Sequence, residues 1–217
     1  MKKEIRRIQS NVKDENLVEK RRQQILQASI RLFRQKGFHR ATTREIAALA
    51  GFSIGTLYEY VRTKEDVLYL ICDRIYHKVS EVFKQFSNEE VTIDQLKVAI
   101  KQYIELVDLM HDEFTIMYQE TKSFPREAID YVIEKEIEMV GFFVKLMEQC
   151  VEQEELNLPS EQIYLAANEI LVVSQSWAFR KWALKHHYTL EQFIEKQTEL
   201  FMHGLKVLNE EARSFMK

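Results

Sequence analysis

Hydroxyl-bearing and basic side chains gather in one short stretch of the chain, residues 42–64. Hydroxyl and ammonium groups donate hydrogen bonds to phosphate oxygens, and such contacts fix the position of a protein on a nucleic acid. The residues of this stretch that suit the role are Thr43, Thr56, Tyr58, Tyr60 and Lys64. An arginine can bond to one guanine through two N–H groups, so Arg44 is the candidate for reading bases, with a phosphate contact or a solvated charge as the alternative.

The same stretch carries the signals of two short helices joined by a tight turn. Thr42 and Glu45 have the spacing of a capping box, in which each side chain satisfies a backbone N–H of the first helical turn. Gly51 stands where the first helix must end in a left-handed residue, and Ser53 is placed to cap the second helix. Two helices around a glycine-containing turn form a helix-turn-helix unit, whose second helix enters the DNA major groove.

The second helix of this pair has an inward and an outward face. Leu57 and Val61 face inward on a helical wheel, whereas Gly55 and Thr56 face outward. Glycine inside a helix costs about 1 kcal/mol relative to alanine. We therefore expect that Gly55 allows the helix backbone to approach DNA closely.

The composition favours an all-α protein with two oppositely charged parts. Only 5 Gly and 2 Pro occur in 217 residues, which disfavours turn-rich folds, and 46% hydrophobic residues suffice for a core. Residues 1–64 contain 15 Lys and Arg against 6 Asp and Glu, a net charge of +9, whereas the remainder has 16 against 28, a net charge of −12. A basic end suits a polyanionic partner; the alternative is an uneven charge that arose by chance.

The sequence contains no apolar run of the roughly 18 residues that span a bilayer, and no catalytic motif. Cys72 and Cys150 lie far apart, as expected of free thiols in a reducing cytosol. The adjacent His186 and His187 would point about 100° apart on a helix and so would not share a metal. We expect a cytoplasmic protein that is not an enzyme, contacts no membrane and needs no cofactor or metal.

The predicted organisation is an N-terminal three-helix helix-turn-helix domain followed by a C-terminal helical domain whose last two helices also pack on another subunit. Residues 1–17 are predicted to be a basic arm, which either touches DNA or has no role. Residues 18–64 form the predicted DNA-binding domain and residues 65–217 the helical domain. Apolar periodicity predicts helices of the second domain over 91–111, 114–120, 163–184 and 190–208, with a further long helix around 129–147.

Three segments resemble the DNA-binding domain of the tetracycline-repressor (TetR) family: residues 42–47, 50–61 and 64–68. The resemblance extends without a gap from about Arg21 to Leu70, and it departs from the family pattern at Val61, where Phe is usual. It implies phosphate binding by Thr43, Tyr58, Tyr60 and Lys64, and a groove lined by Arg44, Ser53, Ile54, Gly55 and Thr56. It also implies a homodimer joined through the last two helices, and a C-terminal domain whose small-molecule ligand alters DNA affinity.

Aromatic and methionine side chains are dense in the second domain, and some lie on helices that the resemblance places around a cavity. The predicted ligand-binding residues are Tyr103, Phe114, Met117, Tyr118, Phe143, Met147 and Trp177. Pockets for apolar ligands have this kind of lining, although most residues of these types are simply core. A small apolar effector, in particular a fatty acyl-CoA, is the ligand we expect.

These features together predict a DNA-binding transcriptional regulator that represses its genes and is released from its operator by an apolar effector. Two alternatives remain open. One is a DNA-organising dimer without an effector, in which the second domain serves only dimerisation. The other is an α-helical lipid-binding protein or small enzyme whose basic end is incidental.

Overall fold

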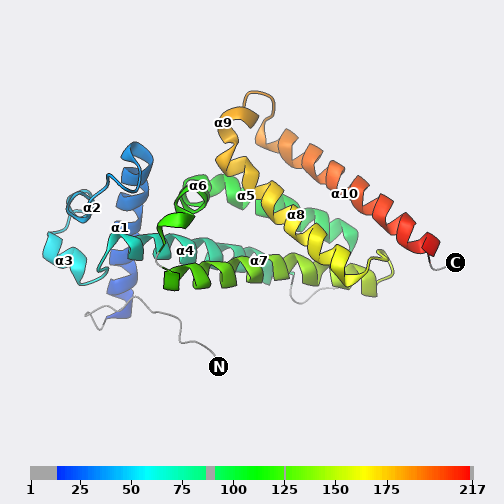
Figure 1. The fold of residues 1–217 in the computed structure, drawn as a ribbon, viewed down its shortest axis with the longest axis horizontal. Coiled ribbons are helices and arrows are strands. Elements are labelled where there is room, and N and C mark those ends of the chain that lie inside the picture. Colours follow the sequence, from blue (N-terminus) through cyan, green and yellow to red (C-terminus); the bar gives the residue numbers. More distant parts are fainter. Residues whose placement is uncertain (1–13, 87–90, 125, 216–217) are drawn as a thin grey trace. The chain divides into compact units, whose positions relative to one another are not determined.

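The computed structural model describes residues 14–86, 91–124 and 126–215, and among these the side chains of 126–128 and 211–215 are not described. The described part of the chain is helical and contains no strand, which confirms the all-α prediction. Its helices are α1 (Glu15–Lys36), α2 (Thr43–Ala50), α3 (Ile54–Tyr58), α4 (Lys64–Lys84), α5 (Ile93–Leu109), α6 (His111–Glu120), the 3-10 turn η1 (Thr121–Ser123), α7 (Arg126–Glu152), α8 (Ser160–Phe179), α9 (Lys181–Leu184) and α10 (Leu190–Phe215) (Figure 1).

The first helix begins earlier than the sequence pattern predicted. Asp14 caps α1 by accepting a hydrogen bond from the backbone N–H of Leu17 at 3.1 Å, so Glu15 is already helical. The predicted basic arm therefore loses its last residues to α1, and its residues 1–13 lie outside the described part of the chain. An acidic cap suits this position because the N-terminus of a helix carries partial positive charge.

The described residues divide into two compact units. The first unit contains the chain up to Ile75 together with Thr115–Ile133, and the second contains Tyr76–Phe114 together with the chain from Glu134 onward. Helices α4, α6 and α7 each contribute residues to both units. None of the helices in the described part of the chain is apolar over a length that would cross a membrane.

Caps and a small core fix the helices of the first unit. Thr42 and Glu45 form the predicted capping box at the start of α2, and Gly51 ends that helix at φ 77°. Ser53 caps α3 by accepting a hydrogen bond from the N–H of Thr56. Behind the helices lies a buried apolar core, which includes Ile25, Phe33, Phe38, Ile46 and Leu57.

The second unit is built around an aromatic cluster from α4, α5, α6 and α7. Phe143 meets Phe83 edge to face at a centroid distance of 4.9 Å and Tyr103 at 5.5 Å. Tyr103 in turn meets Phe114 at 6.4 Å. Aromatic rings of this size bury much apolar surface, and edge-to-face contacts add to the stability that burial provides.

The prediction of one helix over 163–184 was wrong, because the chain breaks at Arg180 between α8 and α9. Asp108 at the end of α5 binds residues on both sides of the break. Its Oδ1 accepts hydrogen bonds from the indole N–H of Trp177 at 2.7 Å and from the ammonium of Lys181 at 2.5 Å. These bonds hold the chain at the corner between α8 and α10 (Figure 1), where neither Gly nor Pro marks the turn in the sequence.

Candidate nucleic-acid interface

The polar side chains of α2 and α3 meet at the surface of the first unit. Thr43 Oγ1 and the Tyr58 hydroxyl are 3.2 Å apart and share a hydrogen bond in which either can be the donor. Tyr58 is 47% exposed, and Arg44 beside Thr43 is exposed as well. Two predicted phosphate contacts thus lie together, next to the predicted base-reading arginine, and each hydroxyl retains capacity for a further hydrogen bond.

The first turn of α3 combines a cap with an exposed glycine. Ser53 Oγ accepts a hydrogen bond from the Thr56 N–H at 3.0 Å and lies 2.9 Å from Thr56 Oγ1. A Cβ added to Gly55 would meet only Ser53 Oγ, at the ordinary van der Waals distance of 3.7 Å. Packing within the described residues therefore does not require glycine here. We call Thr43, Arg44, Ser53, Ile54, Gly55, Thr56 and Tyr58 the reading face.

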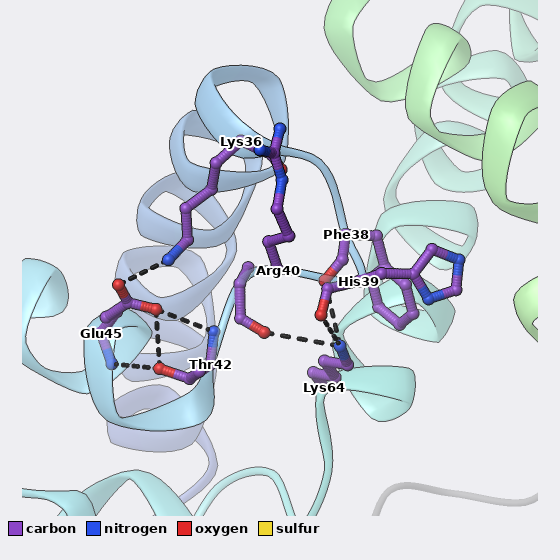
Figure 2. A network of polar contacts seen from close by, with 8 residues as sticks. Lys36, Phe38, His39, Arg40, Thr42, Glu45 and Lys64 are labelled. Carbon is purple, nitrogen blue, oxygen red and sulfur yellow. Dashed lines mark hydrogen bonds and ion pairs between the residues drawn. The ribbon is translucent and has the colours of Figure 1, made fainter.

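Two basic residues that the sequence reasoning did not single out border α2 (Figure 2). Lys36 donates to Glu45 Oε1 at 2.5 Å, and Arg40 Nε donates to the Lys36 carbonyl at 2.7 Å. The hydrogen bond from Lys36, with those from Thr42, lowers the pKa of Glu45 to about 2. Glu45 is thus ionised and paired. The exposed Arg40, which stands just before the cap Thr42, is a further candidate for a phosphate contact.

Tyr60 and Lys64 are positioned differently from the other predicted phosphate contacts. Tyr60 is only 4% exposed and belongs to the core of the first unit, while its carbonyl accepts a hydrogen bond from Arg22 Nε. The ammonium of Lys64 points toward the turn after α1 and binds the carbonyls of Phe38, His39 and Ala41 (Figure 2). Both side chains are engaged within the protein in this structure.

The predicted ligand-binding residues do not all belong together. Tyr103, Phe114, Phe143 and Met147 are fully buried in the second unit, and the first three make the ring contacts of the aromatic cluster. Trp177 also belongs to this unit, but its ring packs on Phe193 of α10 at 4.8 Å and its indole N–H is held by Asp108. The two remaining residues, Met117 and Tyr118, fall in the first unit, with Met117 buried and Tyr118 62% exposed.

A polar group accompanies the aromatic cluster and was not anticipated from the sequence. Gln175 Nε2 donates a hydrogen bond to the Tyr103 hydroxyl at 3.1 Å. Gln175 also hydrogen-bonds to Glu136, whose pKa is raised by burial. The sequence offered only a weak signal for this group. Gln175 stands among apolar residues of α8, and Glu136 is one of several glutamates on α7. These three side chains can hold the polar end of a ligand or stabilise the core.

Because the pKa of Glu136 is raised, the substitution Glu136→Gln should stabilise the folded protein by an amount that depends on pH. Burial raises the pKa of Glu136 in the folded protein. Its protonated form therefore contributes to stability below the pKa of the unfolded chain, which is about 4.3. This contribution is lost as the pH rises through the pKa of the folded protein. Glutamine carries no charge at any pH. The variant should therefore melt at a higher temperature than wild type at pH 7, and the gain should vanish near pH 4.

Glu138, two residues further along α7, is the matched control for this measurement. Burial opposes its ionisation, but hydrogen bonds from Tyr76 and Lys135 outweigh burial and lower its pKa. Its contribution to stability is present above the unfolded pKa and is lost as the pH falls, so Glu138→Gln should lower the melting temperature at pH 7. Equal effects of both variants at pH 7 would contradict the assignment of Glu136 as the buried carboxyl group.

A hollow between α8 and α10 gives the second unit an apolar outer face. It has a volume of about 430 Å³ and its floor includes Ile100 of α5. Large apolar side chains on its two rims are exposed, among them Leu165 of α8 and Leu200 of α10, at 62% and 68%. Exposed apolar surface of this extent is typical of a protein–protein contact.

Sequence comparison decides the family. The family model described as "Bacterial regulatory proteins, tetR family" matches residues 25–69, and the model "Tetracyclin repressor-like, C-terminal domain" matches residues 89–179. The chain belongs to the TetR family of transcriptional regulators. Members of this family bind operator DNA and dimerise, so the helix-turn-helix prediction from the capping pattern is confirmed.

Individual TetR-family proteins resemble the chain over most of its length. The HTH-type transcriptional regulator HbdR of Aromatoleum sp. (strain CIB) is 27% identical over 190 residues, covering 87% of this chain and 82% of HbdR. AibR in complex with isovaleryl coenzyme A and operator DNA has a TM-score of 0.70 at 20% identity, covering 83% of this chain and 97% of that one. FadR from Bacillus subtilis in complex with stearoyl-CoA has a TM-score of 0.67 at 18% identity, covering 82% and 96%.

Proposed function

We propose that this TetR-family regulator is a cytoplasmic repressor that an acyl-CoA releases from its operator. The observation that carries the DNA-binding part is the reading face, where the Thr43–Tyr58 hydrogen bond brings together hydroxyls from α2 and α3 beside the exposed Arg44. In this proposal the hydroxyls bind phosphates, and Arg44 with the first turn of α3 reads bases in the major groove. Arg40 adds a phosphate contact at the edge of α2.

An acyl-CoA is supported as the effector by two independent observations. AibR and FadR, which share the fold, were solved with isovaleryl coenzyme A and stearoyl-CoA. In the second unit the rings of Phe83, Tyr103 and Phe143 pack on one another, and in this proposal an acyl chain enters between them by separating the rings. Tyr103, Gln175 and Glu136 add polar groups at that interior, which can bind a thioester or amide.

Release requires that the effector binds the two states of the dimer with different affinities. In the released state the recognition helices do not match the operator half-sites. An effector can favour this state only to the extent that it binds it more tightly than the DNA-bound state. Tight binding of acyl-CoA alone would therefore not establish induction.

Dimerisation through α8 and α10 is the second part of the proposal. The hollow between these helices exposes Leu165 and Leu200, and a second copy that covers it would remove their apolar surface from water. Leu200→Glu should convert the dimer to a monomer without unfolding it, because Leu200 is exposed in the single chain. Sedimentation velocity together with circular dichroism measures both properties.

The control for Leu200→Glu is Ile137→Glu on α7, where the replaced side chain is also more than half exposed and lies outside the α8–α10 hollow. It should remain a dimer. If Leu200→Glu and Ile137→Glu both remained dimers, the subunits would not associate through α10.

The regulator function is tested by gel shift at fixed salt, with a duplex selected by the protein from a random pool and a scrambled duplex of the same composition. We expect strong preference for the selected duplex, and release on addition of stearoyl-CoA or isovaleryl-CoA but not of free coenzyme A. Equal binding to both duplexes would contradict sequence-specific DNA binding. Specific binding that no acyl-CoA alters would favour the effector-free DNA-organising dimer.

A further inference from the structure

The side chain of Lys64 binds three carbonyls of the turn between α1 and α2. The turn begins after Gly37, the C-cap of α1, and ends at Thr42, the N-cap of α2. The Lys64 ammonium, from the first residue of α4, lies 3.0 Å from the Phe38 carbonyl, 3.1 Å from that of His39 and 3.4 Å from that of Ala41. Figure 2 shows these bonds converging on the ammonium.

These contacts use the whole hydrogen-bonding capacity of the side chain. A lysine ammonium has three N–H donors and no acceptor. Each donor has a carbonyl partner in the turn, and the ammonium also lies 4.4 Å from the centre of the Phe38 ring, within cation–π distance. A phosphate contact by Lys64 would therefore cost at least one of these internal bonds.

The turn that Lys64 holds is connected directly to the reading face. The Ala41 N–H bonds to the Gly37 and Phe38 carbonyls, which closes the turn. The next residue, Thr42, caps α2, and Thr43 of the reading face follows it. A displacement of Lys64 would move three carbonyls of the turn and, through Thr42, the start of α2.

We propose that Lys64 is a positioning residue, and that it fixes α2 relative to α4 by clamping the 38–41 turn. The proposal rests on the proposed DNA-binding function, but it differs from a phosphate contact in its consequences. The three carbonyl contacts of Lys64 join the first residue of α4 to the turn that precedes α2.

Two variants of Lys64 separate the clamp from a phosphate contact. Lys64→Met keeps the apolar stem over Phe38 but removes the donors, and Lys64→Arg keeps the charge in a planar group that cannot direct three donors to the same carbonyls. Arg31→Met is the matched control, since it removes one exposed charge from α1 of the same unit. Each protein is studied by hydrogen exchange without DNA and by binding to the selected and scrambled duplexes over a salt series.

If Lys64 clamps the turn, the amide hydrogens of residues 41–46 should exchange about 10-fold faster in both Lys64 variants than in wild type. Their protection depends on the hydrogen bonds of the turn and of the α2 cap. Binding to the selected duplex should weaken about 10-fold in both variants, with an unchanged salt slope and unchanged binding to the scrambled duplex. Arg31→Met should leave the amide exchange unchanged.

The opposite pattern would overturn the proposal. If Lys64 contacts phosphate, Lys64→Arg binds like wild type, Lys64→Met lowers the salt slope by about 0.9, and amide exchange is unaltered. If wild type prefers neither duplex, the proposed DNA-binding function fails, and hydrogen exchange in the DNA-free protein still decides whether the clamp exists.

Discussion

Replacement of Gly55 by leucine should leave the protein folded, slightly more stable and almost unable to recognise its operator. An added Cβ at this position meets only Ser53 Oγ at 3.7 Å, and glycine in a helix costs about 1 kcal/mol relative to better helix formers. Folding should therefore gain from the change. On the reading face, however, the leucine side chain would keep the α3 backbone away from the base edges.

The expected size of this effect follows from the gap between specific and non-specific binding. That gap is typically 10³-fold or more, and a side chain that blocks entry into the groove leaves only the non-specific part. Affinity for the selected duplex should fall on the order of 10³-fold, with a smaller loss for Gly55→Ala, and binding to the scrambled duplex should change little. Fluorescence anisotropy at fixed salt measures both affinities.

Gly141→Ala provides the control for this prediction. Gly141 lies within α7, and a Cβ added there meets nothing within 4 Å. It should show a similar gain in melting temperature with unaltered operator affinity. If Gly55→Leu retained full operator affinity, α3 could not be the helix that enters the groove.

Local signals explain why the first unit was largely predictable from sequence. Thr42 with Glu45, Gly51 and Ser53 act on backbone groups within a few residues of themselves, so their types and spacing determine where α2 and α3 begin and end. The capping box of Thr63 with Asp66 at the start of α4 follows the same rule. The family match at residues 25–69 covers these capping residues.

The direction of a long side chain was not predictable in this way. Lys64 is the first residue of α4, and its type and position in the sequence predicted a phosphate contact. Its partners Phe38, His39 and Ala41 are more than twenty residues away in sequence and became visible only with the fold. A similar long-range contact, from Lys181 to Asp108, lies just after the end of α8.

The ligand-binding residues were the least predictable, because core and pocket use the same side chains. The apolar pattern of α5 and α7 agrees with the buried positions of Tyr103, Phe143 and Met147. It could not distinguish a cavity wall from a packed core, nor could it reveal that Trp177 is held by Asp108. The assignment of these residues to ligand binding remains a prediction, which core substitutions can test.

Phe143→Ala should be the most destabilising single substitution among the predicted ligand-binding residues. Phe143 is fully buried and makes edge-to-face contacts with Phe83 and Tyr103. Removal of a phenyl ring from a packed core costs about 3–5 kcal/mol, since apolar burial is lost and a cavity remains. Urea unfolding followed by circular dichroism should show this loss in the transition of the second unit.

Phe142→Ala is a control from the same helix, because Phe142 is only half-buried and stacks on Phe83 at a centroid distance of 5.1 Å. Its loss should cost less than half as much as that of Phe143. A cost for Phe143→Ala of about 1 kcal/mol or less would contradict close packing around this ring, since a side chain that borders empty space loses few contacts when it is removed. That outcome would favour a role for Phe143 in the wall of the effector cavity, and stearoyl-CoA should then bind the alanine variant with altered affinity.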